Sequence, residues 1–451
     1  MANTLNFRQA DLYEEGSLLI NRDIGPQTVH TIRGLTVVTA SLFIIGEMAG
    51  SGVLALPKAV LDSGWIGIVM ILVCAVMSAY TGFILGRCWT ILQDRFPIYK
   101  QQTRFPYPAI GYETYGNKGR YLVSFCVNAT LFGVGTVFLL IASENIQELL
   151  TTLHKDFSFC ALLPIIAVCL WPITWLGTPK DFWPVAIGAM CATATACLAM
   201  FIQILLDRNA SETPTYPPSG FSDFFLAFGV ILFAFGGHAA FPTIQHDMRN
   251  PKDFSKVVTV AYAGIVCMYL PVSTAGYFVY GDKNEDNILG VLSASWLTTT
   301  ATCLITVHLI MGFIIVINPL SQEVEDFLGI DKAFNWKRVI NRTVIMGLIL
   351  FVAETIPQFG AILSLVGGST VTLLTFVFPS LFYLKLCSTS CPNQTYSRIP
   401  LPLYQWIIHY EIIFVGIVGG ISSSYSAINA IATGDAQFTV PCYVNATAAH
   451  G

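Results

Sequence analysis

Apolar stretches of about 20 residues recur along this 451-residue chain from Gly34 almost to its end, separated by short polar segments. An α-helix of this length spans the hydrocarbon core of a bilayer. Only 11% of the residues are charged and 54% are hydrophobic, whereas soluble domains are about 25% charged and about 45–50% apolar. The sequence therefore predicts an all-α polytopic membrane protein that has no large soluble domain.

Eleven of these stretches are long enough to be transmembrane helices. The predicted spans are 35–60, 66–85, 121–143, 159–176, 182–206, 224–244, 257–280, 298–320, 339–353, 362–386 and 406–431. They form one membrane domain over 34–432. The segment 1–33 is polar and acidic and has no signal-peptide pattern, so we expect a disordered cytosolic tail there, with a second short tail over 433–451.

Lys and Arg residues predict the orientation of the spans. If the N-terminus is cytosolic, most of the 23 Lys and Arg residues fall in cytosolic segments, as the positive-inside rule requires. The exceptions are Lys58, Lys155, Arg208 and Lys283. With an odd number of spans, the C-terminus then lies outside the cell or in a lumen.

Four residues on this non-cytosolic side bear on that orientation. Asn209 and Asn445 begin glycosylation sequons there, so we expect both to be glycosylated. Cys160 and Cys442 also fall on this side, where disulfides form. Whether they pair stays open, because the sequence does not give the distance between them.

Two interrupted helices share one internal spacing. Gly50-Ser51-Gly52 is followed by Pro57, and Gly236-Gly237-His238 is followed by Pro242, so each proline comes five positions after the last glycine. Glycine and proline free backbone groups from the helical ladder, and within a bilayer such groups survive where they line a cavity. Matched interruptions in two halves of a chain predict a substrate site. Close helix packing by small residues is the alternative.

The two breaks suit the two ends of an amino acid. The amides of Gly50, Ser51 and Gly52 would begin a half-helix, whose positive dipole end favours a carboxylate. The carbonyl groups of Phe235, Gly236 and Gly237 would end another half-helix and favour an ammonium group or a cation.

Titratable residues near the breaks are candidates for proton coupling. Glu47 lies one turn before the first break, at a depth where a charged carboxylate is costly, so we expect it to carry a proton. Capping of freed amides is the alternative role. His238 lies at the second break and is either a proton relay or a structural hydrogen-bonding group. For His308, within the eighth span, we expect hydrogen bonding between helices.

Other classes of function are not indicated. No set of His, Cys or carboxylate residues has the spacing of metal ligands, and no nucleotide-binding or nucleophile motif is present, so we expect neither an enzyme nor a bound cofactor or metal. The net charge of −4 is spread over the loops and gives no basic face for nucleic acid.

Four segments together resemble the amino acid/auxin permease family, in particular its proton-assisted and vesicular branches: 46–64, 107–120, 233–254 and 378–385. The resemblance extends over nearly the whole chain after Arg33. It implies a fold similar to the bacterial leucine transporter, with five plus five helices as inverted repeats (about 34–206 and 222–386) and an added helix (about 406–431). It also implies secondary transport of amino acids, by alternating access around broken helices one and six.

The resemblance leaves the coupling ion open between a proton and sodium. Proton-assisted members carry a histidine in helix one where this chain has Phe43, so Glu47 or His238 would have to carry the proton. The alternative function is an amino acid sensor that signals through its cytosolic tail. In either case we expect a neutral amino acid as the ligand.

The tail contains an acidic dileucine-like signal. Glu14, Leu18 and Leu19 have the spacing that a sorting adaptor would bind, which predicts an endosomal, lysosomal or vesicular membrane. The plasma membrane is the alternative.

Overall fold

The computed structural model describes residues 34–101, 103–155, 157–175, 183–208, 213–331, 333–389, 398–433 and 441–444. Contacts divide the chain into a unit over 1–34 and a unit over 35–451, and the description below concerns the second. The predicted tail 1–33 with Glu14, Leu18 and Leu19 lies outside the described residues. The predicted glycosylation sites Asn209 and Asn445 lie outside them as well.

The described part of the chain is helical, apart from one isolated parallel bridge between Leu35 and Met248. The α-helices are α2 (Val37–Met48), α3 (Ser51–Ser63), α4 (Ile66–Arg95), α5 (Pro106–Thr152), α6 (Phe159–Thr174), α7 (Trp183–Asp207), α8 (Phe221–Ala234), α9 (Phe241–His246), α10 (Phe254–Tyr280), α11 (Trp296–Phe327), α12 (Trp336–Thr355), α13 (Phe359–Val366), α14 (Phe378–Ser388) and α15 (Leu403–Thr433). Two π-helical segments, η5 (Gly367–Val371) and η6 (Leu373–Val377), join α13 to α14. Short 3₁₀ turns occupy Pro97–Lys100, Pro251–Asp253, Gly281–Lys283 and Ile288–Val291.

Each of the eleven predicted spans coincides with a helix or with a broken run of helices. By length and apolar composition, seven helical segments in the described residues could cross a membrane, or eight if the bent pair α2–α3 is one span. The helices α6 and α8 are apolar but shorter than 18 residues. The count of eleven therefore stays a prediction, whereas the all-helical membrane architecture is confirmed.

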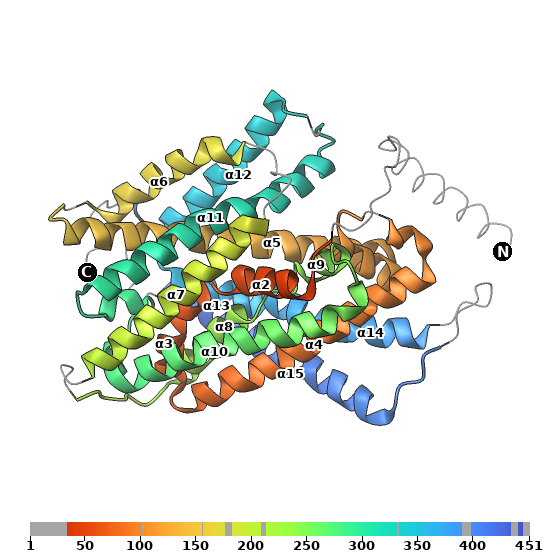
Figure 1. Cartoon of the computed structure of the whole chain (residues 1–451), viewed down its shortest axis with the longest axis horizontal. Coiled ribbons are helices and arrows are strands. Elements are labelled where there is room, and N and C mark those ends of the chain that lie inside the picture. Colours follow the sequence, from red (N-terminus) through yellow and green to blue (C-terminus); the bar gives the residue numbers. More distant parts are fainter. Residues whose placement is uncertain are drawn as a thin grey trace. The chain divides into compact units, whose positions relative to one another are not determined.

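The two interrupted helices lie in the middle of this unit. Figure 1 shows α2 and α8 among the other helices, with α6 and α12 along one edge and α15 along another. The helices α3 and α8 pack closely, because a Cβ atom added at Gly52 would lie only 2.9 Å from Ala234 Cβ. Glycine at this position therefore allows the two half-helices to approach.

A disulfide joins Cys160, at the start of α6, to Cys442, in the segment after α15. The same segment is held to α12, since the Cys442 amide donates to the Glu354 carbonyl (2.9 Å) and the Tyr443 ring stacks on Phe351. The structure thus answers the question that the sequence left open. The two cysteines are 282 residues apart, and only the folded bundle brings them together.

Candidate functional site

The first break separates α2 from α3. The helix α2 ends at Met48, α3 begins at Ser51, and the two axes are bent by 57°. The amides in the first turn of α3 have no partner within the helix, and they carry the positive end of its dipole. Of the amides predicted at Gly50-Ser51-Gly52, those of Ser51 and Gly52 lie in this turn, whereas the Gly50 amide donates to the Met48 carbonyl (3.0 Å).

The second break lies between α8 and α9. The helix α8 ends at Ala234 and α9 begins at Phe241, so the predicted residues Phe235, Gly236, Gly237 and His238 are all outside a helix. Their backbone is held by short turns, such as the bond from the Gly236 amide to the Phe233 carbonyl (3.0 Å). The breaks are therefore real features of both helices.

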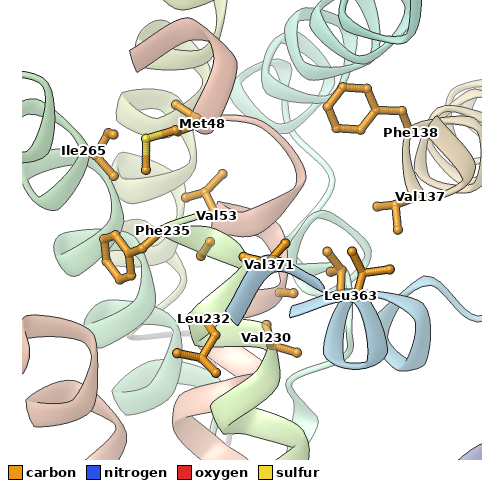
Figure 2. Close-up of a cluster of buried hydrophobic side chains, with 14 of the residues drawn as sticks. Met48, Val53, Val137, Phe138, Val230, Leu232, Phe235, Ile265, Leu363 and Val371 are labelled. Atoms are coloured by element: carbon orange, nitrogen blue, oxygen red, sulfur yellow. The ribbon is translucent and has the colours of Figure 1, made fainter. Parts of the chain in front are cut away.

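The two breaks touch each other. A Cβ atom added at Gly237 would lie 2.7 Å from Met48 Sδ, and one added at Gly236 would overlap Val371 Cγ1 of the π-helical segment η5. Figure 2 shows Met48 and Phe235 on the side of Ile265, whereas Phe138 lies on the opposite side, with Val371 between them. Glycine leaves room for the Val371 side chain at Gly236 and for the Met48 side chain at Gly237.

A small cavity of about 50 Å³ lies between the breaks, with room for a few water molecules. Its lining residues are Glu47, Met48, Gly50, Ser51, Thr130, Leu131, Val134, Phe138, Phe233, Gly236, Gly237, Ala239, Val316 and Val371. The structure thus brings together five of the residues predicted from sequence, and the cavity borders both breaks. Gly52, Phe235 and His238 are not among its lining residues.

The helix α5 supplies a wall of the cavity that the sequence analysis missed. Thr130, Val134 and Phe138 are four residues apart and so lie on one face of the helix. Thr130 Oγ1 lies 2.7 Å from Thr370 Oγ1 of η5, which ties this wall to the π-helical segment. The spacing was visible in the sequence, but an apolar face of this kind is equally typical of ordinary helix packing.

Glu47 is the ionisable residue among the cavity-lining residues of the described chain. It lies in the last turn of α2, and its Oε2 atom is buried without a hydrogen-bond partner among the described residues. A buried, unpartnered carboxylate oxygen is costly unless it is protonated or bound by a ligand. The geometry therefore suits a group that exchanges a proton or contacts a substrate amine.

His238 faces away from this cavity toward α4. Its side chain is fully buried, its Nε2 atom lies 3.1 Å from Thr81 Oγ1, and its ring stacks on Phe241 at a centroid distance of 4.6 Å. The Nδ1 atom has no partner among the described residues. These contacts are those of a histidine that holds the second break against α4.

His308, on α11, makes the interhelical hydrogen bonds expected for it. Its Nδ1 atom lies 3.0 Å from Thr193 Oγ1 and 3.2 Å from the Ala189 carbonyl oxygen, both on α7. Its other ring edge borders the first break, because Nε2 lies 3.0 Å from the position of a Cβ atom at Gly50. No local pattern around His308 indicates this second contact.

The Phe235 carbonyl, predicted to hold a substrate amine, is already hydrogen-bonded within the protein. Its oxygen lies 2.9 Å from Ser78 Oγ and 3.1 Å from the Tyr262 hydroxyl. The ring of Phe235 is fully buried beside Tyr262 and Tyr269. Phe235 therefore attaches the second break to α4 and α10, while Gly236 and Gly237 line the cavity.

Comparison with known proteins agrees with this geometry. Residues 33–428 match the family model described as transmembrane amino acid transporter protein. Among curated relatives from Arabidopsis thaliana, amino acid transporter AVT1J is 25% identical over 404 residues, covering 86% of this chain and 89% of that protein. Amino acid transporter ANT1 is 26% identical over 409 residues, covering 85% and 90%. Amino acid transporter AVT1C is 24% identical over 428 residues, covering 93% and 73%.

A solved structure has the same fold. It is a manganese transporter from Eremococcus coleocola, crystallised with an aromatic bis-isothiourea substituted compound. The TM-score is 0.56 at 10% sequence identity, and the match covers 94% of this chain and 96% of that chain. The leucine-transporter-like fold class predicted from the sequence is thereby confirmed.

Proposed function

Because this chain belongs to the transmembrane amino acid transporter family, we propose that it is a secondary active transporter of neutral amino acids, driven by a proton gradient. The observation that carries the proposal is the cavity between the breaks, which Glu47, Ser51 and Gly236 line together. A substrate bound there contacts both interrupted helices at once. Movement of either one then changes access to the site.

The two ends of the cavity provide the recognition chemistry. The substrate carboxylate binds at the N-terminus of α3, where the amides at Ser51 and Gly52 and the helix dipole favour negative charge. The substrate amine binds toward Gly236 and the Glu47 carboxylate. The remaining wall is largely apolar, from Leu131, Val134, Phe138, Val316 and Val371, which favours an uncharged substrate side chain of small to medium size.

Glu47 carries the coupling proton in this proposal. Its Oε2 atom has no hydrogen-bond partner among the described residues, and Glu47 lines the cavity. Protonation of Glu47 therefore takes place at the site where the substrate binds. The carbonyls at the ends of α2 and α8, which would otherwise attract a cation, accept hydroxyl hydrogen bonds from α10. This arrangement favours a proton over sodium as the coupling ion.

The N-terminus is cytosolic in this proposal. The membrane is endosomal, lysosomal or vesicular if a sorting adaptor binds the signal at Glu14, Leu18 and Leu19. If no adaptor binds it, the protein remains at the plasma membrane. The Cys160–Cys442 disulfide supports the orientation, because disulfides persist on the non-cytosolic side. Glycosylation of Asn209 and Asn445 is part of the same proposal.

The test is uptake of labelled neutral amino acids by the purified full chain in proteoliposomes, with and without an imposed pH gradient, in sodium or potassium buffer. Uptake that needs the pH gradient and not sodium is the expected result. Uptake that needs sodium would overturn the coupling ion. Binding without uptake under any gradient would overturn the transporter and favour an amino acid sensor.

A further inference from the structure

The helix α10 presents two tyrosine hydroxyls to the two breaks. Tyr269 donates to the Met48 carbonyl oxygen (2.7 Å), and Tyr262 donates to the Phe235 carbonyl oxygen (3.1 Å). The two tyrosines are seven residues apart, which is about two helical turns, so they lie on one face of α10. Both side chains are buried, with exposed fractions of 0% for Tyr269 and 4% for Tyr262.

The two carbonyls that accept these bonds occupy equivalent places. Met48 is the last residue of α2, and Phe235 directly follows the last residue of α8. Carbonyl groups at a helix C-terminus have no donor within the helix and carry the negative end of its dipole. Each of the two carbonyls accepts one backbone amide at its own break, from Gly50 (3.0 Å) and from Gly237 (3.3 Å), and the tyrosine adds a donor from a different helix. One helix therefore supplies a donor to the end of each broken half-helix.

Further contacts make the two attachments rigid. The ring of Phe235 stacks on Tyr262 (centroid distance 6.4 Å) and contacts Tyr269 (5.8 Å), so it is held by both tyrosines. Ser78 Oγ of α4 lies 2.7 Å from the Tyr262 hydroxyl and 2.9 Å from the Phe235 carbonyl oxygen, so it contacts both members of this attachment. In Figure 2, Met48 and Phe235 both lie toward Ile265, which is the α10 residue three positions after Tyr262 and four before Tyr269.

We propose that α10 sets the separation of the two breaks, with Tyr262 and Tyr269 as positioning residues that act on the cavity through Phe235 and Met48. Met48 lines the cavity, and Phe235 precedes Gly236, which also lines it. A change at either hydroxyl therefore moves one wall of the cavity relative to the other. In its effect on transport, this inference rests on the proposed function.

The first experiment follows backbone amide hydrogen exchange by mass spectrometry in the purified full chain. Tyr269→Phe should speed exchange by about tenfold in peptides that cover Met48 to Ser51, and leave peptides over Phe233 to Ala239 unchanged. Tyr262→Phe should have the reverse pattern. The matched control is Tyr277→Phe, a buried tyrosine on the same helix whose hydroxyl has no hydrogen-bond partner among the described residues.

This readout does not depend on transport. Equal exchange in wild type and in both variants would overturn the inference, as would faster exchange spread evenly over α10 and its neighbours. If a tyrosine variant fails to fold, its exchange is measured at lower temperature. The single variant Ser78→Ala is then measured as well. Because Ser78 is bonded to the Tyr262 hydroxyl and to the Phe235 carbonyl, both at the second break, Ser78→Ala should speed exchange over Phe233 to Ala239 and leave the peptides over Met48 to Ser51 unchanged.

The second experiment measures amino acid uptake by the same variants. Tyr262→Phe and Tyr269→Phe should each raise KM by about fivefold or more with a smaller change in maximal rate, because a misplaced wall weakens binding. Tyr277→Phe should retain the wild-type KM. If wild type itself takes up no amino acid, the proposed function fails while the exchange result stands. If wild type transports and both variants keep its KM, the positioning role fails.

Discussion

Two glycines of the first break, Gly50 and Gly52, have different neighbours although they are two residues apart. Gly50 lines the cavity and borders the side chain of His308, whereas Gly52 is pressed against the backbone of Ala234 on α8. A side chain at Gly50 therefore takes space from a ligand. A side chain at Gly52 separates two helices.

Alanine substitutions should distinguish these roles. Gly52→Ala should lower the free energy of unfolding by about 1–3 kcal/mol, because the new methyl group would lie 3.0 Å from Ala234 Cα and the helix backbone cannot yield. Gly50→Ala should retain more of that stability and raise the KM for uptake by roughly tenfold. Thermal unfolding and uptake assays check both. The control is Gly347→Ala, since nothing lies within 4 Å of a Cβ atom there. Equal effects of the first two variants would contradict this division.

Glu47 gives a prediction about coupling. In Glu47→Gln the side chain keeps its shape but can no longer exchange a proton, so uptake should cease to respond to an imposed pH gradient while substrate binding persists. Proteoliposome uptake at several gradients, together with a binding assay, measures the two properties separately. Glu411→Gln, at an exposed position of α15, is the matched control. A response to the gradient that survives in Glu47→Gln would move the proton to another residue.

At the scale of elements, the disulfide fixes how the last helix relates to α6. Both cysteines must lie on one side of the membrane, so an even number of crossings separates them. The predicted spans from 159–176 onward are eight in number and satisfy this condition. The segment 441–444 also contacts α12, so it clamps two peripheral helices at once.

Removal of this clamp should be costly. We expect Cys442→Ser and Cys160→Ser each to lower stability by about 2–4 kcal/mol, because the bond closes a loop of 282 residues. The double variant should lose no more than either single one, since both remove the same bond. Thermal unfolding under oxidising conditions measures these differences, with Cys267→Ser as control because Cys267 is a free, exposed cysteine. Additive losses would show that the cysteines act separately.

The elements of the site differed in how far the sequence could predict them. The breaks at Gly50 and Gly236 were predictable because glycine and proline leave a local signal. The role of α5 was not, since Thr130, Val134 and Phe138 belong to a helix with no local irregularity. The bonds from Tyr262 and Tyr269 were equally hidden, because their acceptor carbonyls lie 27 and 221 residues away along the chain, and such bonds leave no pattern near either residue. Local chemistry was readable, whereas contacts between distant helices were not.

At the scale of the whole molecule, a buried charge network connects three peripheral helices. Arg342 of α12 donates to Glu325 Oε1 of α11 (2.6 Å) and to the Thr174 carbonyl of α6 (2.7 Å). Arg342 is 2% exposed and Glu325 is 4% exposed. Nearby, Arg104 donates to Asp326 at the surface. The sequence predicts Arg342 as a cytosolic charge near the start of the span 339–353, whereas the structure buries it between α12, α11 and α6.

Replacing Arg342 alone should destabilise the fold more than replacing Arg342 and Glu325 together. Arg342→Met leaves the Glu325 carboxylate buried beside Arg338 alone, which lies 3.7 Å away, so we expect a loss of about 3–5 kcal/mol. Adding Glu325→Gln to Arg342→Met should recover part of that loss. Thermal unfolding measures both variants. The control is Lys337→Met, at an exposed position on the same helix. A double variant less stable than Arg342→Met would contradict this account.

The bridge between Leu35 and Met248 has a consequence for how the site can open. Through the bond from the Leu35 amide to the Asp247 carbonyl (2.9 Å), the start of α2 is fastened to the residues after α9. On the other side of the breaks, α3 packs against Ala234 of α8 at Gly52. A rearrangement that preserves these contacts carries α2 with α9 and α3 with α8. Each moving unit then contains one half-helix from each half of the chain. The two units separate at the breaks, between α2 and α3 and between α8 and α9.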